Sequence, residues 1–259
     1  MLVLQTITNN ENSTIMKSIN KLILGATGLL ITGMTLVSCT KSFDSKLEAT
    51  YGNASTSNVQ LFIATVGASR NYLIVDNKPV NGAAMTSGSI FPTTGFGFSV
   101  PTGMRSFLLR DTLSTSTQIP VSFAQNLEIG KSYTIFAYDT ITAVKQKTVE
   151  TPIVIPSDTT CRLRFANFVY NPNITSAVDV FSFNRNTNIF TNVNVTDVTS
   201  FIPYPSALIS DTFYVRPTGN TSTNLLKITV GSLTQKRSYT VVYRGSDRGT
   251  KASSLFANY

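Results

Sequence analysis

Short runs of β-branched, aromatic and other apolar residues, bounded by turn residues, recur along the chain after position 58. Several alternate with a period of two. In Cys161–Phe165 the apolar side chains fall on one face and Arg162 and Arg164 on the other, which predicts a half-buried strand with one solvated side. No stretch after Val37 sustains a helical period. The runs that we expect to form strands are Val59–Ala64, Asn71–Val75, Arg105–Arg110, Ser132–Tyr138, Cys161–Phe168, Val178–Phe183, Phe213–Arg216, Leu225–Val230 and Ser238–Tyr243.

The region after position 58 also looks like a tandem duplication. Three pairs of segments correspond at nearly the same offset: Lys131–Phe136 with Arg237–Val242, Leu61–Ala64 with Leu163–Ala166, and Phe98–Pro101 with Ser200–Pro203. The boundary falls near Pro152–Thr160, where Pro156-Ser157-Asp158 interrupts the apolar pattern. We therefore predict an all-β protein with two tandem immunoglobulin-like antiparallel β-sandwich domains, over residues 58–156 and 157–259. Each has roughly 100 residues, the size of an immunoglobulin-like sandwich.

The beginning of the chain has the pattern of a bacterial lipoprotein signal peptide. Lys17 and Lys21 precede an uncharged, mostly apolar run, Leu22–Val37, in the charge order that such peptides show. The run is shorter than the about 20 apolar residues that a transmembrane helix needs. It ends at Leu36-Val37-Ser38-Cys39, which resembles a lipobox. We predict cleavage after a signal peptide over 1–38 and lipidation of Cys39. An ordinary cleaved signal with an incidental cysteine is the alternative.

The segments on either side of that signal complete the expected architecture. Residues 1–15 are polar after Val3 and contain Glu11, so we predict Met16 as the true start. Residues 39–57 are rich in Ser, Thr, Asn and Lys and are expected to form the lipid anchor and a flexible tether. A cysteine with a diacylglyceryl group supplies the several acyl chains that stable anchoring requires. This predicts a lipid-anchored protein of the cell envelope, in the outer membrane, periplasmic or surface-exposed.

Only two cysteines are present, and lipidation consumes Cys39. Cys161 then has no disulfide partner. Because Cys161 alternates with Leu163 and Phe165, we expect it to be a small buried apolar side chain, with a reactive thiol as the alternative.

Part of the pattern resembles a known family. Arg164-Phe165-Ala166-Asn167, followed by Pro172, Ala177–Phe181 and Asn184, resembles the opening of an uncharacterised domain-of-unknown-function family that is found, often in tandem, in lipoproteins of Bacteroidetes. Phe98–Gly103 is similar to the strand-Pro/Ala-Gly segment of that family, and Leu127–Thr134 is similar to its Gly-x-x-Tyr-Thr segment.

This resemblance covers nearly all of residues 58–245. The first copy lacks the early proline, and the second has Gln235–Arg237 where the turn glycine is expected, which leaves the turn types open. The family implies a β-sandwich at the cell surface or in the periplasm and brings no catalytic residues. We interpret the matching Asp179 as a structural hydrogen-bonding residue, with a ligand-binding role as the alternative.

Candidate catalytic chemistry is scarce. The chain has no histidine, which excludes Ser-His-Asp and Cys-His catalysis and most zinc sites. Its 13 Asp and Glu residues are scattered, without a pairing that indicates glycoside hydrolysis. Asp76-Asn77 and Asp247 offer oxygen ligands for calcium, but no dense Asp/Asn loop is present. We predict no enzyme activity, no cofactor and no metal site, with a carboxylate-based hydrolase as a remote alternative.

The formal net charge is +8, with short basic clusters at Lys145–Lys147, Lys236–Arg237 and Arg244–Lys251. This spread, together with export, argues against nucleic acid as a partner. Anionic lipid or acidic polysaccharide fits the compartment better, and a solvated basic face is the simpler interpretation. The aromatic residues expected to pack inside the sandwiches are Tyr133, Tyr138, Tyr239 and Tyr243. Tryptophan, the commonest platform for sugar stacking, is absent.

These observations predict a non-catalytic cell-envelope lipoprotein that acts as a binding or interaction module. An accessory protein of glycan capture is one concrete version. The expected partners are the membrane, through the lipid anchor, and a polysaccharide or a surface protein. The alternative is a structural or adhesion component of the cell surface.

Overall fold

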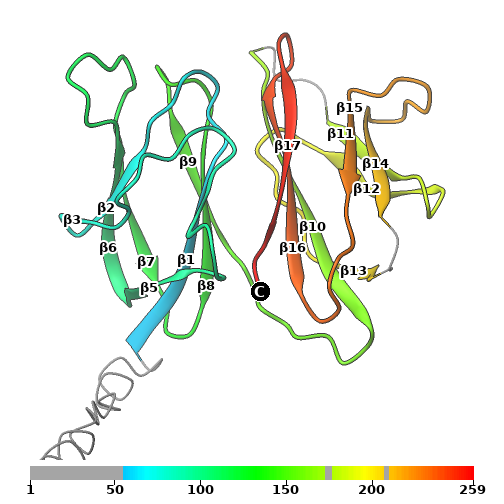
Figure 1. Ribbon diagram of the computed structural model, residues 1–259, viewed down its shortest axis with the longest axis horizontal. Helices are drawn as coiled ribbons and strands as arrows, with labels where there is room; N and C mark the ends of the chain where they lie inside the picture. Colours follow the sequence, from blue (N-terminus) through cyan, green and yellow to red (C-terminus); the bar gives the residue numbers. More distant parts are fainter. Residues whose placement is uncertain (1–54, 173–176, 207–209) are drawn as a thin grey trace, which may run out of the picture. The chain divides into compact units, whose positions relative to one another are not determined.

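The computed structural model describes residues 55–172, 177–206 and 210–259, which form β-strands and no α-helix (Figure 1). This confirms the predicted all-β class. The described residues belong to one compact unit of the chain, Tyr51–Tyr259. The strands are β1 (Thr56–Ile63), β2 (Tyr72–Val75), β3 (Lys78–Pro79), β4 (Ile90–Phe91), β5 (Phe98–Pro101), β6 (Gly103–Arg110), β7 (Val121–Leu127), β8 (Ser132–Tyr138), β9 (Lys145–Glu150), β10 (Thr160–Tyr170), β11 (Val178–Ser182), β12 (Thr187–Val193), β13 (Ile202–Pro205), β14 (Asp211–Pro217), β15 (Leu226–Val230), β16 (Ser238–Ser246) and β17 (Lys251–Ala257).

The strands form four sheets, arranged as two sandwiches (Figure 1). In the first sandwich, the inner sheet has the order β4-β1-β8-β9, with β5 also paired to β1, and the outer sheet has the order β3-β2-β6-β7. In the second sandwich, the inner sheet is β13-β10-β16-β17 and the outer sheet is β12-β11-β14-β15. The pairs β1–β8 and β10–β16 are parallel, and the other pairs are antiparallel. The same strand order therefore occurs twice along the chain.

This order differs from the immunoglobulin order that we expected. In an immunoglobulin domain the first two strands lie in the same sheet. Here the first strand of each sandwich joins the inner sheet and pairs in parallel with β8 or β16, while β2 and β11 lie in the outer sheets. The apolar alternation selects which side chains face the core but contains no information about which strand lies next to which.

Each sandwich has a core of its own, and a third apolar cluster joins the two inner sheets. Val59, Leu61 and Ile63 of β1 point into the first core. Leu163 and Phe165 of β10 point into the second core. The third cluster, which we call the junction, consists of Phe62, Ala64, Phe136, Ala166, Phe168, Val242 and Phe256. Both faces of each inner sheet are therefore buried, which explains why the central strands are nearly continuous apolar runs.

The junction corrects the prediction of a solvated side for β10. Arg164 lies on the same face of β10 as Ala166 and Phe168, and this face is covered by the inner sheet of the first sandwich. The ring centroids of Phe136 in β8 and Phe168 in β10 are 4.5 Å apart in a stacked arrangement. Arg164 is only 2% exposed as a result.

Candidate functional site

Three charged residues are buried among the residues that the structure describes: Arg164, Asp179 and Asp211. A buried charge is costly unless hydrogen bonds or an opposite charge compensate it. How each of the three is compensated therefore separates structural from functional roles.

The two buried carboxylates are saturated with hydrogen-bond donors. Asp179 accepts hydrogen bonds from the backbone N–H groups of Asn192 (2.8 Å) and Gly219 (3.0 Å) and from Asn188 Nδ2 (3.3 Å). It thus ties β12 and the loop after β14 to β11, which agrees with the structural role predicted for it.

Asp211 is held in the same way. It accepts hydrogen bonds from the Ser182 and Tyr204 hydroxyls and from the N–H groups of Asn184 and Thr212. Burial alone would raise the pKa of Asp211, but these donors outweigh burial and lower it. A carboxylate that is ionised and fully occupied has no proton to donate in acid catalysis.

Arg164 is compensated differently, because its partners are neutral hydroxyl groups. Its Nε donates to Thr240 Oγ1 at 2.8 Å, within the second sandwich. Its Nη2 donates to Thr134 Oγ1 at 3.1 Å and to Thr151 Oγ1 at 3.0 Å, both in the first-sandwich part of the chain. The oxygens of Thr134 and Thr151 are themselves 2.8 Å apart and hydrogen-bonded. One guanidinium therefore connects the two sandwiches.

The hydrogen bonds continue from Arg164 across the junction without meeting another charge. Thr240 Oγ1 donates to Asn258 Oδ1, Asn258 Nδ2 donates to Gln60 Oε1 at 2.8 Å, and Gln60 Nε2 donates to the Ala257 carbonyl at 3.0 Å. Gln60, Thr240 and Asn258 are buried. We call this chain, from Thr151 to Gln60, the junction network. Its single charge is that of Arg164.

Among the residues that the structure describes, no carboxylate offsets that charge. The ion pairs between described residues join other side chains, and none includes Arg164. Burial lowers the pKa of the Arg164 guanidinium to about 9, which still leaves it positive at neutral pH. Its Cζ lies 4.7 Å from the centroid of the Phe201 ring, a cation–π contact that only partly replaces water.

Two of the five N–H donors of Arg164 have no acceptor among the residues that the structure describes. An arginine carries five such donors, and the hydrogen bonds to Thr134, Thr151 and Thr240 all come from Nε and Nη2. Nη1 makes no hydrogen bond to any residue that the structure describes. Because Arg164 lines a cleft at the edge of the junction, the unused donors mark the cleft as a place where an acceptor can bind.

This cleft, which we call the arginine cleft, has a volume of about 430 Å³. It is lined by Val149, Glu150, Pro152, Val154, Arg162, Arg164, Val198, Thr199, Ser200 and Phe201. The other charges of the lining are already paired. Glu150 forms an ion pair with Lys131 at 2.7 Å, and Arg162 lies 3.8 Å from Asp158. Arg164 is therefore the group in this lining that lacks a counter-charge.

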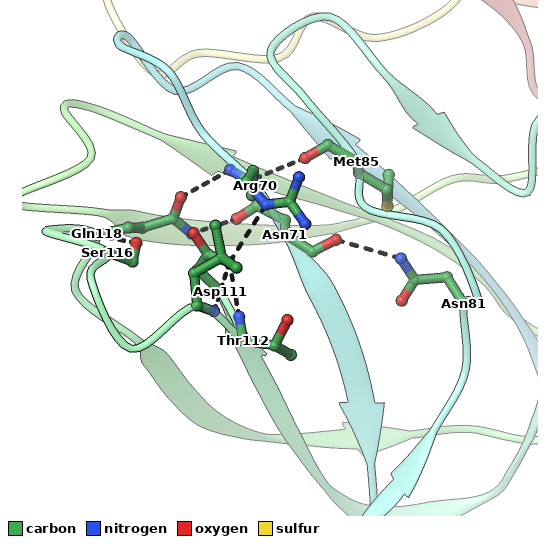
Figure 2. A network of polar contacts seen from close by, with 9 residues as sticks. Arg70, Asn71, Asn81, Met85, Asp111, Thr112, Ser116 and Gln118 are labelled. Carbon is green, nitrogen blue, oxygen red and sulfur yellow. Dashed lines mark hydrogen bonds and ion pairs between the residues drawn. The ribbon is translucent and has the colours of Figure 1, made fainter.

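A second arginine, Arg70, shows the contrast. Figure 2 shows it beside Asp111, with Nε and Oδ1 3.5 Å apart, and its backbone N–H donates to Gln118 Oε1 at 3.0 Å. Gln118 Nε2 donates in turn to Asn71 Oδ1 at 2.8 Å (Figure 2). The side chain of Arg70 is 43% exposed and has a carboxylate partner. This network holds loops of the first sandwich together and leaves no charge uncompensated.

The other residues singled out in the sequence fall in different places. Cys161 is fully buried and free, and its Sγ donates to the Tyr204 carbonyl at 3.4 Å. Its burial in the second core confirms the predicted small buried side chain, and burial raises the pKa of the thiol to about 11. Tyr133 and Tyr243 are buried, whereas Tyr138 and Tyr239 are half-buried. Cys39, the signal peptide and most of the tether lie outside the described residues.

The described ranges offer no sign of a membrane span or of a metal centre. No helix there is long and apolar enough to cross a bilayer. No group of three or more Cys, Asp or Glu side chains in those ranges is arranged to hold a metal ion. Comparison with known proteins finds no family model and no curated protein that matches the chain. The family resemblance described above therefore stays a prediction.

Proposed function

We propose that this protein is a non-catalytic binding protein of the cell envelope, which captures a carboxylate-bearing ligand in the arginine cleft. The observation that carries the proposal is Arg164, a buried cation with free Nη1 donors and no carboxylate partner among the described residues. A ligand carboxylate at Nη1 would supply the missing counter-charge. Hydrogen bonds between ions are shorter and stronger than neutral ones, and more so away from water.

The rest of the lining favours a ligand that is only partly polar. Val149, Val154 and Val198 offer apolar contacts, and Thr199 and Ser200 offer hydrogen-bonding groups. The volume of about 430 Å³ lies within the range of small-molecule sites, roughly 300–1,000 Å³. The cleft thus suits a carboxylate on a small ring or short chain, such as a sugar acid.

The placement in the envelope rests on the N-terminal pattern. A signal peptide over 1–38, a lipid on Cys39 and a tether that ends where β1 begins, at Thr56, would hold the sandwiches at the outer membrane, in keeping with the resemblance to Bacteroidetes lipoproteins. The repeated strand order supports a tandem duplication. A protein at this position can take up an acidic ligand, such as a fragment of an envelope or environmental polysaccharide.

One observation favours the structural or adhesion alternative. The two inner sheets share the apolar junction, which would make a stiff double sandwich suited to a spacer. That function would not require Arg164 to remain uncompensated. The hydrolase alternative gains no support, because Asp179 and Asp211 are saturated with donors.

The proposal is tested by titrating D-galacturonate into the full chain by calorimetry, with neutral D-galactose as the matched sugar. Val154 lines the cleft and is 58% exposed, while its neighbour Ile155 is 56% exposed and is not part of the lining. Val154→Asp therefore adds a repelling charge without disturbing a core, and Ile155→Asp is its control.

We expect the wild type and Ile155→Asp to bind galacturonate equally, and Val154→Asp to bind it roughly tenfold more weakly, since one charge interaction of about 1.4 kcal/mol corresponds to that factor. Galactose should not show saturable binding. Equal binding by the two variants, equal binding of the two sugars, or no binding of galacturonate would contradict the proposal.

A further inference from the structure

A second cleft lies at the same junction. It has a volume of about 480 Å³, and its lining includes Tyr138, Asp139, Lys145, Phe168 and Tyr170. The ring centroids of Tyr138 and Phe168 are 5.2 Å apart in a tilted arrangement. We call it the tyrosine cleft.

The two clefts share their walls. β9 contributes Lys145 to the tyrosine cleft and Val149 to the arginine cleft. The segment 195–201 contributes its first residues, Val195 and Thr196, to the tyrosine cleft and its last four residues to the arginine cleft. Strand β10 follows the same order, with Arg164 in the arginine cleft and Tyr170 in the tyrosine cleft. The clefts therefore lie end to end along one groove.

Lys147 lies in β9 between the residues that line the two clefts. Its Nζ donates to the carbonyl of Thr196, a residue of the tyrosine-cleft lining, at 2.7 Å. Side chains alternate along a strand, so Lys145, Lys147 and Val149 share the face of β9 that borders the groove. With a rise of about 3.3 Å per residue, the six residues of β9 span roughly 17 Å. A groove of this length is longer than a single small sugar.

The charges along the groove are unevenly compensated. Lys145 pairs with Asp139 at 2.7 Å, and these two neutralise each other. Lys147, like Arg164, forms no ion pair with a carboxylate among the described residues. Two cations without counter-charges, placed one after the other, favour a ligand that repeats its negative charge.

The lining of the tyrosine cleft favours sugar rings over peptide side chains. Tyr138 and Tyr170, which are half-buried, provide ring faces, and Asp139 and Thr140 lie beside them with oxygen atoms that can bond sugar hydroxyls. We infer that the arginine and tyrosine clefts are two subsites of one groove for an acidic oligosaccharide, a chain of sugar rings with repeated carboxylates. This inference rests on the proposed function, because the first carboxylate would bind at Arg164.

The test compares galacturonic acid with its linear tetramer, using calorimetry on the full chain. A tetramer of glutamic acid serves as an acidic peptide of similar charge. Ala143 lines the tyrosine cleft, while Thr142 beside it is also exposed and is not part of the lining. Ala143→Asp is therefore the test variant and Thr142→Asp its control. Lys147→Gln is compared in the same way with Lys227→Gln, since Lys227 is exposed in β15 of the outer sheet.

We expect the galacturonate tetramer to bind at least roughly tenfold more tightly than the monomer, because it makes contacts in both subsites. Ala143→Asp and Lys147→Gln should each weaken the binding of the tetramer by about tenfold and leave the affinity for the monomer unchanged. Thr142→Asp and Lys227→Gln should change neither.

The failures are distinguishable. Suppose that the monomer binds and that Val154→Asp weakens its binding, but that the tetramer binds no more tightly than the monomer or binds Ala143→Asp as tightly as the wild type. The two-subsite inference is then wrong, and the proposed function stands. If the glutamate tetramer binds as tightly as the saccharide, the groove is a peptide site and the saccharide inference is wrong. If neither monomer nor tetramer binds, both proposals fail.

Discussion

Arg164 donates a hydrogen bond from Nη2 to Thr134 Oγ1, over 3.1 Å, and thereby connects β10 of the second sandwich with β8 of the first. Both side chains are buried. The group that we propose as the anion site is thus also part of the contact between the sandwiches.

The first prediction concerns the contribution of Arg164 to the free energy of unfolding. Buried ion pairs can often be replaced by apolar side chains of similar volume at little cost or with a gain in stability, because the cost of removing the charges from water disappears. The same desolvation cost applies to Arg164, which has no opposite charge among the described residues to offset it. The Thr134–Thr151 and Thr240–Asn258 hydrogen bonds can persist without Arg164. We expect Arg164→Met to change the free energy of unfolding by no more than about 1 kcal/mol, or to raise it. Urea unfolding measures this, with the exposed Arg110→Met as a control for net charge. A loss of several kcal/mol would show that the arginine is primarily structural.

The second prediction concerns the ligand's effect on heat stability. A ligand that binds only the folded state stabilises it by about 2.7 kcal/mol at one hundred times its Kd. For a domain of this size that corresponds to a rise in Tm of roughly 5–10 °C. We expect galacturonate at this concentration to raise the Tm of the wild type and of Ile155→Asp equally, and that of Arg164→Met by about half as much or less, in a thermal melt. An equal rise in all three would place the binding elsewhere.

The third prediction concerns Cys161. Burial raises the pKa of its thiol to about 11, from an ordinary value of 9.0. Since the folded pKa is the higher one, the stabilising contribution of the buried thiol is fully present below about pH 9 and is lost as the pH rises toward about 11. At about pH 8, we expect Cys161 to react with iodoacetamide only when urea unfolds the protein, as read from peptide masses. Rapid labelling of the folded protein would contradict its burial.

The fourth prediction tests the aromatic contact at the junction. Phe136 at the junction and Phe107 in the first core are both fully buried. Either Phe→Ala change should cost about 3–5 kcal/mol. Only Phe136→Ala removes contacts between the sandwiches, so calorimetry should show their unfolding separated into two transitions for this variant. A single transition in Phe136→Ala, at the temperature of Phe107→Ala, would mean that the junction does not couple the sandwiches.

The fifth prediction concerns a glycine. Gly245 has φ +96°, and a Cβ there would lie 2.2 Å from the Thr250 carbonyl oxygen. Gly245→Ala should therefore cost about 2–3 kcal/mol or more in the free energy of unfolding. At Gly231, by contrast, an added Cβ would meet nothing within 4 Å, so Gly231→Ala should stay within about 0.5 kcal/mol of the wild type. Urea unfolding of the two variants measures both changes. Similar losses in both would contradict this account.

The apolar pattern located the central strands because burial determines their sequence. Ser132–Tyr138 coincides with β8, and the predicted Val59–Ala64 and Cys161–Phe168 overlap β1 and β10. The pattern missed β9, Lys145–Glu150, whose sequence is mostly polar because β9 is the edge strand of its inner sheet. It also missed short strands such as β5 and β13, which end in proline. Strand order was not predictable, since it depends on contacts between distant segments.

The site was only partly visible in the sequence. Alternation correctly placed Arg164 on the face of β10 opposite Leu163 and Phe165, and wrongly predicted that this face meets water. The available signal was that Ala166 and Phe168 share the face of Arg164, which a fully solvated face would not favour. The residues that cover this face belong to β8, and no local pattern in β10 indicates that β8 lies against it.

The most direct test of the central claim is a calorimetric titration of galacturonate into the wild type and Arg164→Met, after urea unfolding has shown that both are folded. A ligand carboxylate at Nη1 predicts saturable binding by the wild type and a loss of roughly tenfold to a hundredfold in Arg164→Met, the value of one or two charge-assisted hydrogen bonds. Binding of equal strength by the two folded proteins would contradict the assignment of Arg164 as the anion site.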